Sequence, residues 1–217
     1  MAAAERMIQQ DNGDEAERSR REGMATFEHN AGFRQTLGHI AMIRGDVDAA
    51  VGLFSEACLL APADAHLMED LARAEIEAEH YADAEYTLRR LIVMSSDLDR
   101  RDLKYLHARC LIELDRPVEA RTTLLELSAD AHGSKDARVW IELGRIALIL
   151  KEDRRLRECA QRITSLDPSR ADGHLMMAVW LDRTGRTEAG IETLKRAMRL
   201  SDDPISLTVM QGVLYQK

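Results

Sequence analysis

Apolar residues recur along most of the chain three or four positions apart, the spacing of amphipathic helices, with short polar or turn-forming stretches between them. One column of small residues recurs within these helical stretches at intervals of 34 or 36 residues. Its members are Gly38, Ala72, Ala108, Gly144, Ala178 and Gly212. Six small residues in register predict an internal repeat, and a period of this length is typical of stacked helical units.

Two further columns follow the first one at fixed distances. The second column, twelve residues on, is Ala50, Ala84, Ala120, Leu156 and Gly190, and the third, another four on, is Phe54, Leu88, Leu124, Ala160 and Leu194. Small residues let two helices approach closely, while a larger residue one turn later fills the groove opposite. Each repeat is therefore predicted to be a pair of helices. In the fourth repeat the small and large residues exchange places, which conserves volume at that contact.

Glycine and proline mark the turns of this pattern. Gly45 and Gly185 each stand where the first helix of a pair should end in a left-handed cap. Pro117 stands near the start of a second helix, where its fixed φ is suitable. Pro62 and Pro168 are predicted to close two of the repeats, because proline cannot continue a helix.

These features resemble the tetratricopeptide repeat (TPR) family of helix hairpins. Two units carry the resemblance best: residues 31–64, with Leu37, Gly38, Gly45, Ala50, Phe54, Ala57 and Pro62, and residues 137–170, with Trp140, Leu143, Gly144 and Pro168. The resemblance implies an all-α protein, a right-handed α-solenoid of about five TPR-like helix hairpins plus a C-terminal helix. The five repeats fill residues 31–204 as 31–64, 65–98, 101–134, 137–170 and 171–204. The two longer steps predict extra residues in the connections 95–102 and 128–136.

The two ends of the chain depart from this pattern. Residues 1–30 are rich in charge, and both a degenerate hairpin and a tail remain open for them. Residues 205–217 resemble the first helix of a sixth repeat and carry two apolar stripes, one of them Leu207, Met210 and Leu214. One stripe should be exposed. Either the chain is a piece of a longer array, or this surface joins a partner or a second copy of the chain.

Composition supports a helical protein and narrows its partners. Of the 217 residues 45% are hydrophobic, 31% are charged and only 4% are aromatic, which favours helix over sheet. The net charge of -8 repels phosphate backbones, so we expect no nucleic-acid partner. The same charge argues against the helical-repeat proteins of similar period that bind RNA. No apolar run is long enough for membrane insertion, and we expect a cytoplasmic protein.

The sequence contains no motif that predicts catalysis. It has no Gly-x-Ser-x-Gly elbow, glycine-rich phosphate loop or His-Glu-x-x-His segment. Cys58, Cys110 and Cys159 lack metal-site spacing and stand in apolar helical patterns, which predicts small buried side chains. We therefore expect no enzymatic activity, no cofactor and no metal site.

In TPR proteins the first helix of each pair lines a concave groove, so the residue after each small residue should point into it. That column is His39, Arg73, Arg109, Arg145 and Val179. With neighbours one turn away, the predicted peptide-binding groove is Gln35, His39, Met42, Glu69, Arg73, Ile76, Tyr105, Arg109, Ile112, Ile141, Arg145 and Leu148. Such arginines could hold carboxylates or backbone carbonyls of a peptide. The alternative is that they pair with Glu69, Glu142 and neighbouring acids.

The lysine and asparagine set with which one TPR subclass grips a C-terminal carboxylate is missing. Gln35, His39 and Asp70 stand at the matching places, followed by Asp102 and Leu106, and acids there would repel a carboxylate. The sequence thus predicts a non-enzymatic scaffold that binds a peptide or protein segment during multiprotein assembly. The alternative is a TPR fragment or homo-oligomer that stacks through its C-terminal helix.

Overall fold

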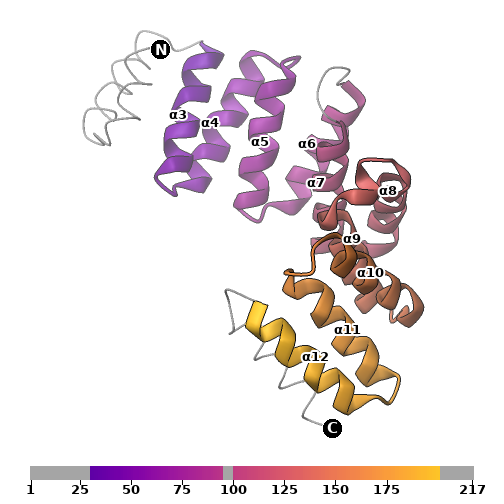
Figure 1. The fold of residues 1–217 in the computed structure, drawn as a ribbon. Coiled ribbons are helices and arrows are strands. Elements are labelled where there is room, and N and C mark those ends of the chain that lie inside the picture. The colour runs from indigo at the N-terminus through magenta and orange to yellow at the C-terminus, as the bar shows by residue number, and fades with distance from the viewer. Residues whose placement is uncertain (1–29, 95–99, 201–217) are drawn as a thin grey trace. The chain divides into compact units, whose positions relative to one another are not determined.

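The computed structural model describes residues 30–94 and 100–200, which form ten α-helices and one 3-10 turn without any strand (Figure 1). The all-α class predicted from the sequence is confirmed. The chain divides into two compact units, one ending at Leu114 and the other beginning at Asp115. The expectations for residues 1–29 and 205–217, including the surface of Leu207, Met210 and Leu214, lie outside the described residues.

The helices follow one another in pairs along the chain. Unit 1 holds α3 (Ala31–Ile43), α4 (Val47–Leu60), α5 (Ala65–Glu77), α6 (Tyr81–Met94) and α7 (Arg100–Glu113). Unit 2 holds α8 (Pro117–Ala129), the 3-10 turn η1 (Gly133–Lys135), α9 (Ala137–Ile149), α10 (Asp153–Leu166), α11 (Ala171–Arg183) and α12 (Thr187–Leu200). One difference from the sequence prediction is that α7 begins at Arg100, within the segment expected to be a connection.

Polar caps and prolines set several helix ends. Four helices begin at an Asn or Asp whose side chain accepts a hydrogen bond from a backbone N–H two or three residues on. These caps are Asn30, Asp46, Asp64 and Asp136. Pro117 lies in the first turn of α8, as predicted. Pro62 and Pro168 follow the ends of α4 and α10, which confirms their predicted role.

The turns inside the hairpins share one backbone geometry. Gly45 and Gly185 adopt φ values of 76° and 78°, so both predicted left-handed caps are confirmed. At the equivalent turn positions Glu79, Asp115 and Lys151 also have positive φ, between 56° and 60°. In the turns after α3, α5, α9 and α11, the next backbone N–H donates to the carbonyl five residues earlier at 2.8 to 3.0 Å. This hydrogen bond is that of a Schellman motif.

The three sequence columns are the contacts between the helices. All of their described members are buried. A methyl group added at Gly38 would lie 2.6 Å from the ring of Phe54, so the small residue and the large one fit each other as predicted. Gly144 faces Met176 of α11 and, at 3.5 Å, the Cβ of Cys159. The close approach of the helices therefore requires glycine, which has no side chain, at positions 38 and 144.

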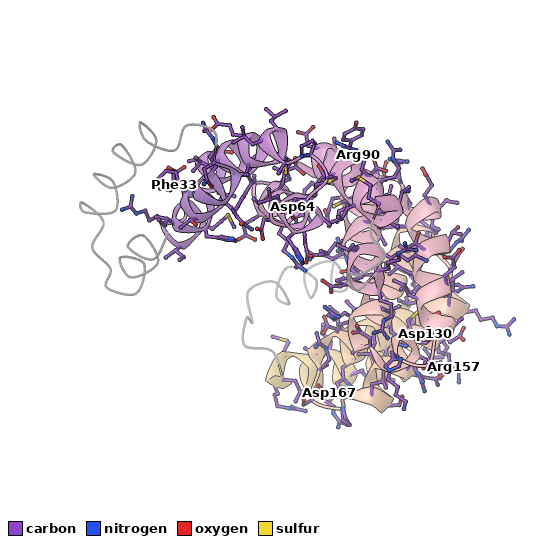
Figure 2. All side chains as sticks on the ribbon, turned by 90° about the horizontal axis from the view of Figure 1, so that it is seen from above. Phe33, Asp64, Arg90, Asp130, Arg157 and Asp167 are labelled. Atoms are coloured by element: carbon purple, nitrogen blue, oxygen red, sulfur yellow. The ribbon has the colours of Figure 1, made fainter. Side chains whose placement is uncertain are left out.

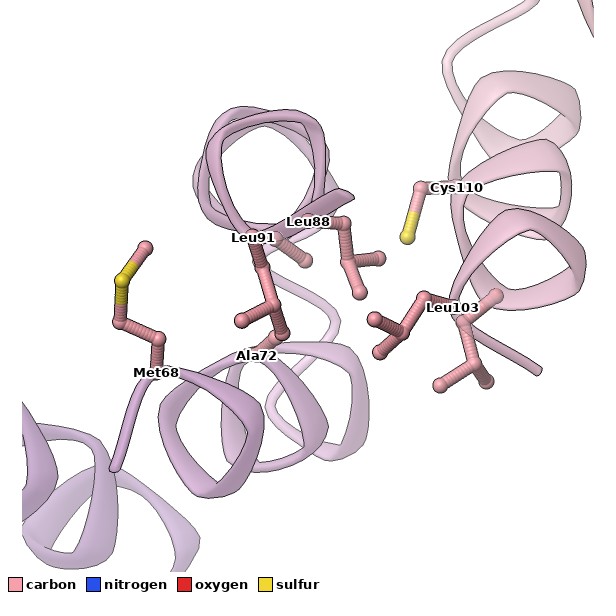
Figure 3. Close-up of a cluster of buried hydrophobic side chains, with 8 residues drawn as sticks. Met68, Ala72, Leu88, Leu91, Leu103 and Cys110 are labelled. Atoms are coloured by element: carbon pink, nitrogen blue, oxygen red, sulfur yellow. The ribbon is translucent and has the colours of Figure 1, made fainter. Parts of the chain in front are cut away.

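The core of unit 1 includes a cluster between α5, α6 and α7 (Figure 3). Figure 3 shows Ala72, Leu88, Leu91, Leu103 and Cys110 turned toward one another between these helices. Burial raises the pKa of the Cys110 thiol to about 11. This thiol and that of Cys159 in unit 2 are buried as predicted, whereas Cys58 is half-buried.

Candidate functional site

Polar side chains connect the first helices of unit 1 to one another. They lie on α3, α5 and α7, and we call the surface that they form the first-helix face. Its members are Gln35, His39, Glu69, Asp70, Arg73 and Asp102. All six are partly exposed, so the network is open to a ligand.

Asp70 joins α5 to α3. One of its carboxylate oxygens accepts a hydrogen bond from the side-chain amide of Gln35 at 2.6 Å, and the same oxygen lies 3.3 Å from Nε2 of His39. The imidazole of His39 also meets the ring of Phe54 edge-on, with the ring centres 5.1 Å apart. The two α3 side chains are thus held in place by a carboxylate and a core aromatic ring.

Arg73 joins α5 to α7. Its Nη2 donates to Glu69 at 2.7 Å and to Asp102 at 2.9 Å, and its Nε donates to Glu69 at 3.0 Å. Desolvation would lower the pKa of Arg73, but the hydrogen bonds to Glu69 and Asp102 outweigh it and raise the pKa above its ordinary value. Because the side chain is still 48% exposed, the guanidinium is oriented by its partners and remains accessible.

The remaining predicted groove residues of unit 1 differ in exposure. Met42, Ile76, Tyr105 and Arg109 are half-buried, on the same helices as the first-helix face. Ile112 is only 6% exposed, so it is a core side chain and offers no surface to a ligand. The prediction that Ile112 lines the groove is therefore wrong. Helical periodicity shows which way the side chain of residue 112 points, but it does not show which residues cover it.

In unit 2 the predicted groove residues lie on α9. Arg145 donates to Glu142 at 2.9 Å, and Ile141 and Leu148 pack against the core cluster of this unit. The alternative of internal pairing, drawn from the sequence, is thus observed for Arg73 with Glu69 and for Arg145 with Glu142.

The acceptors that link one helix to the next do not follow from the position of the small-residue columns. From the sequence, Asp70 and Asp102 are predicted only to repel a carboxylate. Asp70 follows Gln35 by 35 residues and Asp102 follows Arg73 by 29. A search for complementary polar residues about one repeat apart could have found both pairs.

Two chemical properties of the described residues bear on function. Within residues 30–94 and 100–200, no group of three or more His, Cys, Asp or Glu side chains is arranged to hold a metal ion. None of the helices in these ranges has both the length and the apolar character that crossing a membrane requires.

Comparison with known proteins identifies the fold. No protein-family model matches the chain, and no curated sequence matches it either. Among solved structures, a tetratricopeptide repeat protein from Parabacteroides merdae has a TM-score of 0.81 at 14% identity, over 98% of this chain and 83% of its own.

Two other solved structures agree with this match. YrrB, described as a TPR protein with an unusual peptide-binding site, has a TM-score of 0.65 at 15% identity, over 90% of this chain and 98% of its own. MamA from Desulfovibrio magneticus has a TM-score of 0.70 at 17% identity, over 80% of this chain and 97% of its own. With its paired helices, small-residue columns and turns, the chain has the helix-hairpin repeat fold of these tetratricopeptide repeat proteins.

Proposed function

We propose that this protein is a non-enzymatic interaction scaffold that binds a segment of another protein on its first-helix face during multiprotein assembly. The observation that carries the proposal is the polar network across α3, α5 and α7, whose side chains are oriented by one another yet partly exposed. Surfaces that are ordered before binding lose less conformational entropy when a ligand arrives.

The charges of this face indicate what kind of contact the segment makes. Arg73 is already paired with two carboxylates, and Asp70 already accepts from Gln35. A ligand carboxylate would have to compete with Glu69 and Asp102 for the guanidinium. We therefore favour an extended segment whose backbone carbonyls and amides meet Arg73, Gln35 and the acids, with apolar side chains against Met42 and Ile76.

Two further observations support the proposal. The structural neighbour YrrB has, by its description, a peptide-binding site in the same fold. The thiols of Cys58, Cys110 and Cys159 are all free, which suits the reducing cytoplasm. Self-assembly through Leu207, Met210 and Leu214 stays an untested alternative, because these residues lie outside the described ones.

The test is selection of peptides that bind the immobilised full chain, followed by affinity measurements on the selected peptides with a variant that carries Gln35→Ala and Arg73→Ala. We expect the double variant to bind at least about tenfold more weakly, since the lost contact of the charged Arg73 guanidinium alone is worth about 1.5–3 kcal/mol. Lys195→Ala is the matched control. Lys195 is 52% exposed and paired with Glu192 at 2.7 Å, but it lies on α12.

Circular dichroism must show unchanged helix content in each variant. The proposal fails if no peptide is selected, or if peptides bind the double variant and Lys195→Ala as tightly as the wild type.

A further inference from the structure

A second candidate site lies on unit 1 away from the first-helix face, in a pocket of about 390 Å³ between α4, α5 and α6. We call it the Glu75 pocket. Its apolar wall includes Met68 and Leu71, and its polar wall includes Glu75 and Asp83. Clefts that hold small ligands begin at about 300 Å³, so the pocket has room for one side chain and its neighbours.

The carboxyl group of Glu75 is the unusual feature of this pocket. The residue is only 6% exposed, and one carboxyl oxygen, Oε2, is buried without a hydrogen-bond partner among the described residues. The side chain of Thr87 forms a hydrogen bond with the Glu75 carboxyl group. An unpaired buried acceptor costs about 1–3 kcal/mol, so a ligand that donates to Oε2 would recover part of that cost.

The charges around the pocket select the sign of the ligand. Burial, followed by the charge of Glu75 and then those of Asp64 and Asp70, raises the pKa of the Cys58 thiol in the pocket wall to about 11, whereas Arg90 lowers it. The Arg90 guanidinium lies 5.7 Å from the centre of the Tyr86 ring, and Figure 2 shows Arg90 at the edge of the unit 1 helices. When Glu75 is ionised, it and Asp83 outnumber this one cation in the wall, so the pocket then favours a positive group.

The surroundings of the pocket indicate that a protein presents this group. Leu59 and Tyr86, both in the pocket wall, are 80% and 53% exposed, and Val93 on α6 is 79% exposed. An exposed leucine and an exposed tyrosine in one pocket wall, with an arginine over the tyrosine, have the composition of a protein-binding surface.

We propose that the Glu75 pocket receives a lysine side chain of a partner protein. The methylene groups of this lysine lie against Met68 and Leu71, and its ammonium group donates a hydrogen bond to Glu75. The exposed apolar residues at the rim then contact the segment that carries this lysine. The surface is separate from the first-helix face, so a protein could use both at once.

Ionisation of Glu75 couples this binding to pH. The titratable or charged groups that face it are Asp83 and Arg90 on α6, Cys58 on α4 and Cys110 on α7. Burial and the charge of Asp83 raise the pKa of Glu75 to about 7, against the hydrogen bond from Thr87. The ionised fraction of such a group falls about tenfold from pH 8 to pH 6, and the affinity for an ammonium group should fall with it.

The experiment titrates the ¹⁵N-labelled full chain with n-butylammonium, which reproduces the lysine side chain, and with n-butanol as the uncharged probe. We expect saturable shifts of amides in α4, α5 and α6 with n-butylammonium, weakened about tenfold at pH 6 relative to pH 8. Alkylation of Cys58 should slow in parallel, whereas n-butanol should bind at least about tenfold more weakly.

Variants separate the role of Glu75 from general packing. Glu75→Gln keeps the shape and should abolish the preference for the ammonium probe. Asp83→Asn, at an exposed position, should weaken binding two- to threefold at pH 8, where Glu75 is ionised with or without the charge of Asp83. Asp48→Asn, an 86% exposed acid on α4 outside the pocket wall, should change nothing.

The proposal is overturned if both probes bind equally, if neither shifts these amides, or if the Glu75→Gln variant retains the preference. If Glu75→Gln does not fold, two other results test the proposal. Binding of n-butylammonium that is unchanged in Asp83→Asn at pH 8, or equal at pH 6 and pH 8 in the wild type, overturns it. Arg73→Ala should leave probe binding unchanged, so failure of this site and failure of the first-helix face are distinguishable.

Discussion

At the scale of single residues, the fit between helices depends on glycines, which leave space, as much as on the large side chains that fill it. Gly38 and Phe54 show this best, because the ring occupies the space that a larger residue at position 38 would need. The sequence columns predict that a large residue such as Phe54 fills the groove opposite, since helical periodicity fixes which side chains face a neighbouring helix, and the structure shows that Gly38 is the residue it meets.

Gly38→Ala should destabilise the protein although alanine is the better helix former. The new methyl group would meet the ring of Phe54, which is 1% exposed and cannot move away freely. Overpacking costs about 1–3 kcal/mol, against about 1 kcal/mol gained in helix propensity. Urea unfolding followed by circular dichroism measures the difference.

Gly52→Ala is the control for this prediction, because a methyl group at Gly52 meets nothing within 4 Å. It should stabilise the protein by up to about 1 kcal/mol. A stabilising Gly38→Ala would contradict the tight contact with Phe54.

Glu75 makes stability depend on pH in the direction opposite to that of a paired carboxylate. Burial and Asp83 raise its folded pKa from 4.5 to about 7, so between these values the folded state binds more protons than the unfolded state. Stability therefore falls as the pH rises through this window, by about 3 kcal/mol. Urea unfolding should show Glu75→Gln close to the wild type at pH 5 and clearly more stable at pH 8. An equal difference at both pH values would refute this assignment.

The sequence did not reveal Glu75 as an unusual residue. An acid in a charged helix normally points to solvent, and periodicity alone does not show that Thr87 and the pocket wall cover it. Ile112 is the reverse case, an apolar residue assigned to a surface that is buried in the structure.

At the scale of helices and turns, the sequence predicts the positive φ of the hairpin turn only where the residue is glycine. Gly45 and Gly185 were assigned correctly because glycine adopts positive φ without strain. Glu79 and Lys151 adopt the same conformation, yet nothing about their side chains indicates it. Their place in the repeat determines the conformation, and the rest of the turn imposes it against their preference.

Replacement of Lys151 by glycine should therefore stabilise the turn between α9 and α10. Lys151 is exposed and has a φ of 56°, a conformation that costs an ordinary residue about 1 kcal/mol. We expect Lys151→Gly to raise the free energy of unfolding by somewhat less than that, because glycine also loses more chain entropy. Thermal and urea unfolding give the value.

The opposite change, Gly45→Ala, should have the opposite effect on stability. The position has φ of 76° and open space around it, so only backbone strain is added, and stability should fall by about 1 kcal/mol. The interpretation would be wrong if both variants shifted stability in the same direction.

At the scale of the whole molecule, the chain divides at Leu114 and Asp115, inside the turn between α7 and α8. The repeat pattern runs through this point without a change of composition, which is why the sequence indicates no boundary there. Stability in repeat proteins is the sum of repeat and nearest-neighbour contributions, so damage to one unit need not spread evenly.

Leu88→Ala tests how far such damage spreads. Leu88 is fully buried in the cluster of α5, α6 and α7, and its truncation should cost about 2–5 kcal/mol. In hydrogen exchange, amides of α3 to α7 should lose more protection than those of α9 to α12. Leu194→Ala in α12 should give the reverse pattern. Uniform loss of protection in both variants would mean that the two units unfold as one.

The contact between Gly144 and Met176 has a consequence for how such a chain can evolve. The fourth repeat leaves a space that the fifth repeat fills with a methionine, and 34 residues earlier the corresponding position holds Glu142. A tandem duplication of residues 137–170 would therefore set a carboxylate where the thioether sulfur now lies. Copying of this unit would thus replace an apolar contact at Gly144 by a buried acid, so neighbouring repeats are matched to each other by their side chains at this contact.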